Sequence, residues 1–281
     1  MDSQDLSRSA LRLIAEKEPL DLARAALAVA HEEYPALDEA AYLRKLDEIA
    51  EQVMRLLPPG ALPERRVGRL NLVLFRELGF RGNDADYYDP RNSFLNEVLD
   101  RRVGIPITLS VVYLEVARRC GLAAQGVNFP GHFLCKVPLD EGELIVDPFN
   151  RGRLLGKDDL QKLLESTSRD ARLSARHLRP ASGRDIVTRM LHNLRSVYLE
   201  RHDVPRALSA VERMLVLAPS DTRTLRERAQ LYEKLGGSSA AAADLLRVLE
   251  LEPGAKDAQA LRARVVRLRG GKTLTLTLTL T

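Results

Sequence analysis

The stretch Gly104-Ile105-Pro106 decides how this chain folds, together with Gly131-His132 and Asp147-Pro148 further along. The first stretch has the pattern of a helix start, and the other two lie in segments that favour β-strands. A helix start, a histidine and an aspartate in this order form the skeleton of a site that transfers acyl groups through a thiol. In such a site a cysteine at the helix start has its pKa lowered by the helix dipole and an imidazolium. Pro106 occupies that position, so the sequence predicts the frame of a thiol site without its nucleophile.

A helix is predicted from about Pro106 to Cys120. Proline is favoured in the first turn of a helix because the N–H it lacks would be unpaired there anyway. Apolar side chains recur every three or four residues and predict one face packed into a core, namely Leu109, Val112, Tyr113, Val116, Ala117 and Cys120. Gly121 ends the helix, and we expect Cys120 to be a buried, inert thiol.

Two β-rich runs on either side of a turn predict a hairpin. They span residues 133–137 and 144–146. Folding the hairpin about Leu139-Asp140 sets Lys136 opposite Glu143, a favourable cross-strand pair. The same register sets His132 opposite Asp147. The carboxylate would then fix the tautomer of a catalytic imidazole. Alternatively, the pair would line a retained pocket that binds a peptide, amide or small ligand without turnover, or would serve only as a hydrogen bond that ties the hairpin together.

Other nucleophiles fit this frame poorly. Cys135 follows His132 by three positions, and on a strand an odd offset points to the opposite face. Cys120 lies about four turns further along the helix than Pro106. Ser110 is one turn from Pro106 on the same side, so it is the best substitute. It would need His132 within hydrogen-bond reach.

The first 80 residues are predicted to form a helical region, 1–80, packed on a core that spans 81–175. Amphipathic spacing predicts helices at about 20–33, 38–57 and 65–78. Asp38 is a plausible N-cap. A polar loop follows at residues 81–92 and contains Tyr87-Tyr88. These two rings either pin the loop to the domain or contact a ligand.

The last third of the chain repeats itself every 34 residues. The matching positions are Tyr198 and Tyr232, Ala207 and Ala241, Leu215 and Leu249, and Pro219 and Pro253. This period matches the tetratricopeptide repeat, whose stacked helices bind peptides and helices of partners. We expect the module to span 184–269, after a linker at 174–183. Residues 270–281, which end in alternating Thr and Leu, are interpreted as a low-complexity tail without a role in the fold.

The composition is that of a globular cytoplasmic protein. Hydrophobic residues make up 45% and charged residues 29% of the 281 residues. The start of the chain is polar, so we expect no signal peptide, and no apolar run is long enough to span a membrane. Two cysteines build neither a disulfide framework nor a zinc site, and no phosphate-binding loop occurs. The sequence thus predicts no cofactor and no metal.

The net charge of +4 is uneven, because residues 151–281 hold 25 basic and 15 acidic side chains. RNA binding through this basic part is one hypothesis, and it predicts an affinity that falls steeply with salt. The arginines are spread among glutamates, however, and aromatic residues for base stacking are absent between them. The sequence therefore argues against a nucleic-acid partner.

Four motifs together resemble the SirB-type regulator family, at residues 92–96, 102–110, 126–134 and 147–150. Members are bacterial proteins with a transglutaminase-like core followed by tetratricopeptide repeats. The resemblance covers roughly residues 35–265. It implies an α+β papain/transglutaminase-like core with a helical N-terminal region, followed by an all-α tetratricopeptide repeat module.

In active transglutaminase-like enzymes a Gly-x-Cys motif precedes a helix that ends Ala-Arg-x-x-Gly. Counting back from Gly121, the cysteine position falls on Pro106, while His132 and Asp147 fall on the histidine and aspartate of the family. The resemblance therefore implies a degenerate site and a regulatory or protein-binding role.

Taken together, the residues and the resemblance predict a non-catalytic scaffold or regulator, a pseudoenzyme that binds a protein or peptide through its repeat module. They predict no particular oligomeric state. The alternative is a hydrolase or acyl-transferase that uses Ser110, His132 and Asp147.

Overall fold

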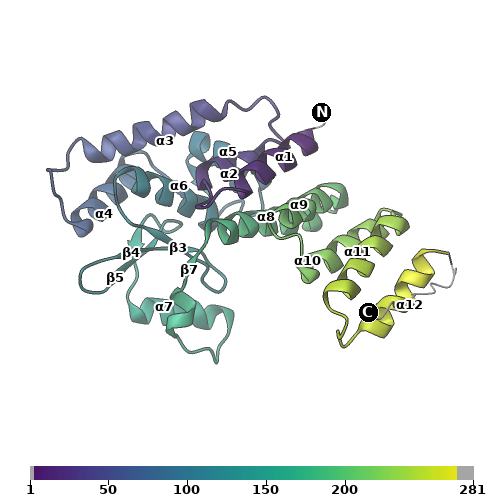
Figure 1. Cartoon of the computed structure of the whole chain (residues 1–281). Coiled ribbons are helices and arrows are strands. Elements are labelled where there is room, and N and C mark those ends of the chain that lie inside the picture. The colour runs from purple at the N-terminus through teal and green to yellow at the C-terminus, as the bar shows by residue number, and fades with distance from the viewer. Residues whose placement is uncertain (1–2, 271–281) are drawn as a thin grey trace. The chain divides into compact units, whose positions relative to one another are not determined.

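The structure is a computed structural model that describes residues 3–270 (Figure 1). It has two compact units, one ending at Asn193 and the other beginning at Leu194. The predicted low-complexity tail, 270–281, lies outside the described residues except for Gly270.

The first unit begins with α1 (Ser3–Ala15), which the apolar spacing did not predict. The helices that it did predict follow, namely α2 (Leu22–Ala30), α3 (Glu39–Met54) and α4 (Pro63–Asn71), which continues as a π-helix, η1 (Leu72–Glu77). The predicted N-cap is confirmed, because the Asp38 carboxylate accepts the N–H of Ala41 at 3.1 Å. Helices α2, α3, α4 and η1 share one hydrophobic core with α5 (Leu95–Arg101) and α6 (Pro106–Arg119).

A five-stranded antiparallel sheet has the order β6-β5-β4-β3-β7. Its strands are β3 (Gln125–Val127), β4 (Leu134–Pro138), β5 (Glu143–Asp147), β6 (Arg153–Leu154) and β7 (Pro180–Ala181). Helix α6 covers one face, and α7 (Lys157–Thr167) lies on the other side (Figure 1). Successive residues of β4 follow this division, since Cys135 joins the core around α6 and Leu134 joins the core around α7.

The predicted hairpin register is wrong by two residues. In the structure Lys136 pairs with Ile145, and Pro138 pairs with Glu143. The reason is the turn, which Leu139 closes by donating its N–H to the carbonyl of Gly142 at 3.0 Å. A shift of two leaves every side chain on its predicted face. The Lys136–Glu143 ion pair therefore forms diagonally, at 3.2 Å.

The predicted linker at 174–183 is also wrong. Residues 175–178 form a short 3-10 helix, η3 (Ala175–Leu178), and residues 180–181 form β7, which pairs with β3. This segment therefore completes the sheet. The division between the two units lies further on, inside α8 (Gly183–Glu200).

The second unit has the helix–turn–helix pattern of the repeat. It contains the end of α8, then α9 (Val204–Leu217), α10 (Thr222–Lys234), α11 (Ser238–Leu251) and α12 (Ala258–Leu268). Helices α9 and α11 begin and end 34 residues apart, as the period predicts. The matched residues Ala207 and Ala241 are fully buried, which explains why the period selects a small side chain there. Within residues 3–270, no helix has the length and apolarity needed to cross a membrane.

Candidate functional site

His132 and Asp147 form a buried hydrogen-bonded pair. The Nε2 atom of His132 lies 2.9 Å from Oδ1 of Asp147, and the two side chains are 9% and 3% exposed. His132 stands just before β4, and Asp147 is the last residue of β5. The turn before the histidine needs glycine, because Gly131 has a φ of +70°. The predicted contact between the two side chains is thus confirmed.

The Asp147 carboxylate is the centre of a larger hydrogen-bond network. Its Oδ1 atom accepts the backbone N–H of Phe149 at 3.1 Å and of Asn150 at 3.2 Å, and its Oδ2 atom accepts the Asn150 amide at 2.7 Å. Burial raises the pKa of Asp147, but the hydrogen bond and charge of His132 and the bonds from Asn150 outweigh it, so the pKa lies below its usual value. The carboxylate is therefore ionised and accepts a hydrogen bond from the Nε2–H group of His132.

The sequence reasoning gave Asn150 no role, although the Asp-Pro-Phe-Asn motif contained it. The signal was available: an asparagine three residues after a turn aspartate can hydrogen-bond back to its carboxylate.

Pro106 is the first residue of α6 and is buried. Its ring offers neither a thiol nor a hydroxyl. The helix start is held instead by Thr108, whose hydroxyl accepts the N–H of Ile105 at 3.2 Å and donates to the carbonyl of Asn92 at 2.7 Å. This arrangement is a capping interaction. The position at which active transglutaminase-like enzymes are expected to have their cysteine thus has only a structural side chain in this chain.

A short strand joins the start of α6 to the loop after Asp147. Strand β1 (Arg81–Gly82) runs parallel to β2 (Val103–Gly104). The N–H of Asn83 donates to the carbonyl of Gly104 at 3.0 Å, and the N–H of Gly82 donates to the carbonyl of Phe149 at 3.1 Å. A Cβ atom on Gly82 would lie 2.5 Å from the Phe149 ring. Only glycine therefore permits this approach.

Ser110, the predicted substitute nucleophile, is engaged elsewhere. It is fully buried, and its Oγ atom donates to the carbonyl of Phe133 at 3.5 Å. Among the described residues no hydrogen bond joins Ser110 to His132. The structure therefore brings the histidine and the aspartate together but does not bring the serine to them.

Both cysteines are buried, as predicted. Burial raises the pKa of the Cys120 thiol to about 11, against a smaller opposite effect of Arg66. Burial also raises the pKa of Cys135, whose Sγ atom donates to the carbonyl of Ser110 at 3.8 Å. Neither thiol resembles an activated nucleophile, which needs a lowered pKa.

Tyr87 and Tyr88 lie next to the site. The Tyr87 ring meets the Phe149 ring edge-on, with centroids 6.2 Å apart, and Phe149 meets His132 in the same way at 6.0 Å. Tyr87 remains 40% exposed and Tyr88 53% exposed. Tyr87 therefore anchors its loop on Phe149, while both tyrosines leave aromatic surface exposed.

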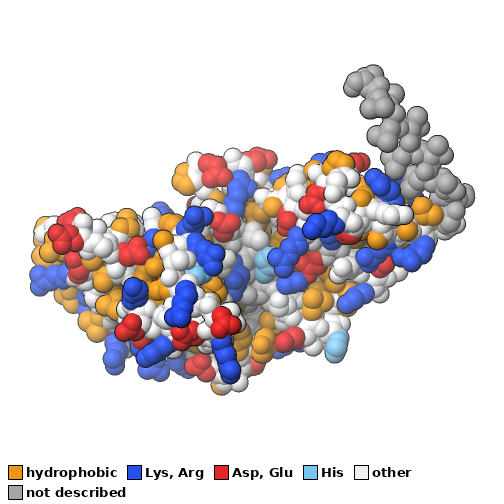
Figure 2. Space-filling view, turned by 90° about the horizontal axis from the view of Figure 1, so that it is seen from below, with side chains coloured by type: hydrophobic (Ala, Val, Ile, Leu, Met, Phe, Trp, Pro, Cys, Tyr) orange, Lys and Arg blue, Asp and Glu red, His pale blue; other side chains and the backbone are white. Residues whose placement is uncertain are grey.

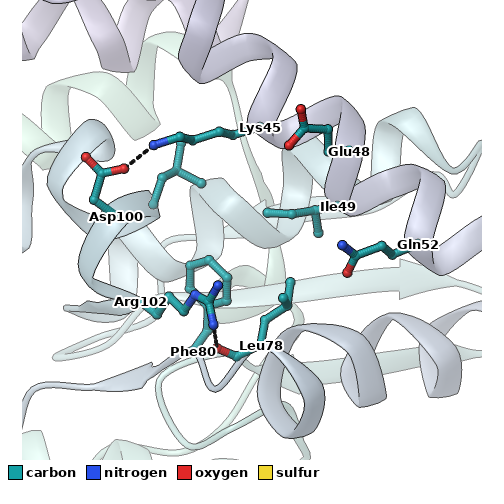
Figure 3. Close-up of a pocket in the computed structure, with 9 residues that line it drawn as sticks. Lys45, Glu48, Ile49, Gln52, Leu78, Phe80, Asp100 and Arg102 are labelled. Carbon is teal, nitrogen blue, oxygen red and sulfur yellow. Dashed lines mark hydrogen bonds and ion pairs between the residues drawn. The ribbon is translucent and has the colours of Figure 1, made fainter.

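A separate pocket of about 280 Å³ opens between α3 and α5 (Figure 3). Its lining includes Ile49, Leu78 and Phe80. Three of its charged residues, Lys45, Asp100 and Arg102, are engaged by neighbouring residues. Lys45 forms an ion pair with Asp100, and Arg102 donates to the carbonyl of Leu78 at 2.9 Å. The ion pair therefore joins α3 to α5, and the bond from Arg102 ties the residue after α5 to the residue after η1.

The structure also bears on metals and on nucleic acid. Within residues 3–270, no three His, Cys, Asp or Glu side chains group as metal ligands would.

On the face shown in Figure 2, basic side chains lie among acidic ones. In the repeat unit many arginines are paired, including Arg195 with Glu227, Arg226 with Asp257, Arg228 with Asp244 and Arg264 with Glu233. This pairing does not resemble a continuous phosphate-binding surface.

Comparison with known proteins gives a match in each unit. The family model of the transglutaminase-like superfamily matches residues 40–192, and a tetratricopeptide repeat model matches residues 194–266. A UPF0162 protein of Xylella fastidiosa is 40% identical over 257 residues, which cover 90% of this chain and 92% of that protein. A UPF0162 protein of Pseudomonas aeruginosa is 36% identical over 235 residues, 84% of this chain and 86% of that one. Human F-box only protein 21 is 31% identical over 179 residues, which cover 59% of this chain and 28% of that protein.

Proposed function

Because the chain belongs to the transglutaminase-like superfamily, and within it to the UPF0162 proteins, but has Pro106 at the helix start, we propose that it is a non-catalytic scaffold or regulator. Its partner is a protein or peptide bound through the repeat unit. The observation that carries the proposal is Pro106 as the first residue of α6, together with the hydrogen-bonded His132–Asp147 pair. Among the described residues no thiol or hydroxyl is hydrogen-bonded to this pair, so we propose that it serves to build a binding surface.

The hydrogen bonds around the site support this reading. Catalysis by a serine needs the base within about 2.6–3.2 Å of the hydroxyl, whereas the Ser110 hydroxyl bonds to a backbone carbonyl. A buried hydroxyl in that position also has no room for a substrate acyl group. We therefore place the hydrolase or acyl-transferase second and use it as the competing outcome of the first experiment.

The repeat unit supports a protein partner. Stacked tetratricopeptide helices present a surface that accepts helices or extended segments. We propose that this unit makes the main contact and that the degenerate site adds a second. We also propose that the chain acts in the bacterial cytoplasm, as a SirB-type regulator would.

The first experiment tests the absence of acyl transfer. The full chain is incubated with a glutamine-containing protein and a fluorescent primary amine, and separately with an acyl ester. Intact-mass spectrometry then searches for acyl adducts. We expect the chain and its His132→Ala variant to give the same background. An adduct on Ser110 that disappears in His132→Ala would overturn the proposal in favour of the enzyme.

The second experiment tests the binding role. Affinity capture compares the full chain with a chain that ends at Glu200, the last residue of α8. We expect partners captured by the full chain to be lost by the shortened one, while circular dichroism and hydrogen exchange show that the first unit stays folded. Retention of the same partners would move the binding role to the first unit.

A further inference from the structure

A pocket of about 630 Å³ opens within the first unit, between the end of α6, the strands β3 and β7, and the chain just before α2. Its lining includes neither His132 nor Asp147. Most of the lining is apolar, and it contains Leu20, Leu114, Leu122, Ala124 and Ile186. A cavity of this size, with apolar walls and few polar groups, is typical of a site for a small molecule.

The walls of this pocket are held by close packing. A Cβ atom on Gly126 would lie 3.0 Å from both Ile186 and Phe133, so glycine lets β3 approach the start of α8. A Cβ atom on Gly183 would lie 3.2 Å from Leu20, so the chain before α2 also packs directly on the start of α8. The pocket is therefore a built part of the fold, as ligand sites usually are.

One buried carboxylate interrupts the apolar lining. The Glu115 side chain is 4% exposed, and its Oε2 atom accepts hydrogen bonds from Arg118, at 3.0 Å, and from Arg119. Its Oε1 atom accepts no hydrogen bond among the described residues, and it is not one of the fully enclosed polar atoms that lack a partner. Because Glu115 lines the pocket, Oε1 is an acceptor that a bound molecule can use.

Arg118 supplies donors beside this acceptor. It also lines the pocket, its side chain is 64% exposed, and only its Nη2 atom is bonded to Glu115. The other N–H groups of the guanidinium are available to a ligand. The charge of Glu115 is also balanced by Arg119, which is 13% exposed and pairs with Asp47 at 2.6 Å. The pocket therefore presents an acceptor and a donor side by side, next to apolar walls.

The charges of the lining favour a neutral ligand. An anion would face the carboxylates of Glu115 and Asp21, whereas a cation would face the guanidinium of Arg118. A primary amide or a lactam has an N–H and a C=O on the same edge, so it can donate to Glu115 and accept from Arg118 at once. A site with a donor and an acceptor discriminates against molecules that leave one of them unpaired.

We propose that this pocket binds a small neutral molecule that combines an apolar body with a primary amide or lactam. The amide N–H donates to Oε1 of Glu115, the amide C=O accepts from Arg118, and the apolar body packs on Leu114, Leu122 and Ile186. This site goes beyond the proposed scaffold function and does not depend on it.

The experiment uses three matched probes on the full chain, namely benzamide, benzoate and benzamidine. They share one ring and differ in charge and in hydrogen-bonding groups. NMR titration follows the backbone signals of Ala123 and Gly126, which line the pocket. We expect benzamide to bind about tenfold more tightly than either ion, which is the usual net effect of one or two hydrogen bonds. The larger 2-naphthamide should bind more tightly than benzamide, because it buries more apolar surface.

One variant and one matched control test the polar contact. Arg118→Met keeps an unbranched apolar side chain and removes the donors. It should weaken benzamide by about threefold to tenfold, and it should strengthen benzamidine because a like charge is removed. Arg247→Met is the control: Arg247 is 51% exposed and pairs at 2.9 Å with Glu250, three residues away, but does not line the pocket. It should change no affinity.

Binding of benzoate or benzamidine as tight as that of benzamide would overturn this inference on the unchanged chain. Signals of Ala123 and Gly126 that stay unmoved up to the solubility limit of benzamide would reject the pocket altogether. An equal loss in Arg118→Met and Arg247→Met would contradict the contact with Arg118. These outcomes are separate from the scaffold proposal: if benzamide fails to bind while the shortened chain loses its partners, the scaffold role stands and only this pocket is rejected.

Discussion

The two units bury a charged aspartate in different ways. In the first unit Asp147 is 3% exposed, and its partners are a buried imidazole, two backbone N–H groups and one amide. In the repeat unit Asp244 is 7% exposed and pairs with Arg228, which remains 24% exposed. The first carboxylate is part of a fixed network, while the second has a partner that can turn toward water. The difference suggests that the first unit offers a preorganised site and the second an adaptable surface.

The largest effect is expected from Asp147→Ala. The change leaves buried donors on His132, Phe149 and Asn150 without an acceptor. Removing one partner of a buried pair costs about 3–5 kcal/mol, so the free energy of unfolding of the first unit should fall by that amount. Urea unfolding followed by hydrogen exchange in β4 and β5 measures it without assuming that the whole chain unfolds in one step.

Asp147→Asn is the matched control, because it keeps an acceptor oxygen and loses the charge. It should cost less than alanine. A loss below about 1 kcal/mol for Asp147→Ala, within the range of ordinary surface substitutions, would show that the network is not a buried cluster.

A smaller effect is expected from Asp244→Ala in the repeat unit. Both hydrogen bonds of the pair are lost, since Arg228 donates from Nε at 2.8 Å and from Nη2 at 2.6 Å to the Asp244 carboxylate. The freed guanidinium can reach solvent, so the loss should be about 1–3 kcal/mol, as for hydrogen bonds to charged groups. Hydrogen exchange in α10 and α11 reports it. A loss equal to that of Asp147→Ala would remove the contrast between the units.

The acid response should also differ. The pKa of Asp147 is lower in the folded chain than its usual value of about 3.9. Its contribution to stability is therefore complete above about pH 4 and is lost as pH falls through the folded pKa, because below the unfolded value the unfolded chain binds more protons. Unfolding of the first unit between about pH 5 and 2 should be less steep in Asp147→Asn. An unchanged slope would contradict the lowered pKa.

Regular spacing let the sequence predict the regular parts of the fold. The 34-residue period located α9 and α11, and the three- and four-residue spacing along α6 predicted its buried face. The hairpin strands were also predicted, but their register was wrong. It depended on one hydrogen bond in the turn, Leu139 to Gly142, which residue types alone do not specify.

Only the part of the site that follows from local sequence patterns was predicted. His132 and Asp147 were predicted because their motifs fix their order along the chain. The register error of two residues is an even number, so it leaves both side chains on the same face of the sheet. The contributions of Asn92 and Phe149 were missed. They act through long-range contacts, such as the approach of Gly82 to Phe149, which no local pattern shows. The linker prediction failed likewise, because β7 is a strand only through its pairing with β3.

The smallest effect is expected from Glu143→Ala, which removes the diagonal ion pair with Lys136. The Glu143 side chain is 37% exposed, and Lys136 keeps a hydrogen bond to the carbonyl of Leu178 at 3.0 Å. Exposed ion pairs contribute about 0–1 kcal/mol, so the free energy of unfolding should fall by about 0.5 kcal/mol or less, and added salt should remove the difference. Lys136→Ala should cost more, because it also leaves the Leu178 carbonyl without its partner. If the two variants cost the same, the bond to Leu178 contributes nothing, and the ion pair alone stabilises this end of the hairpin.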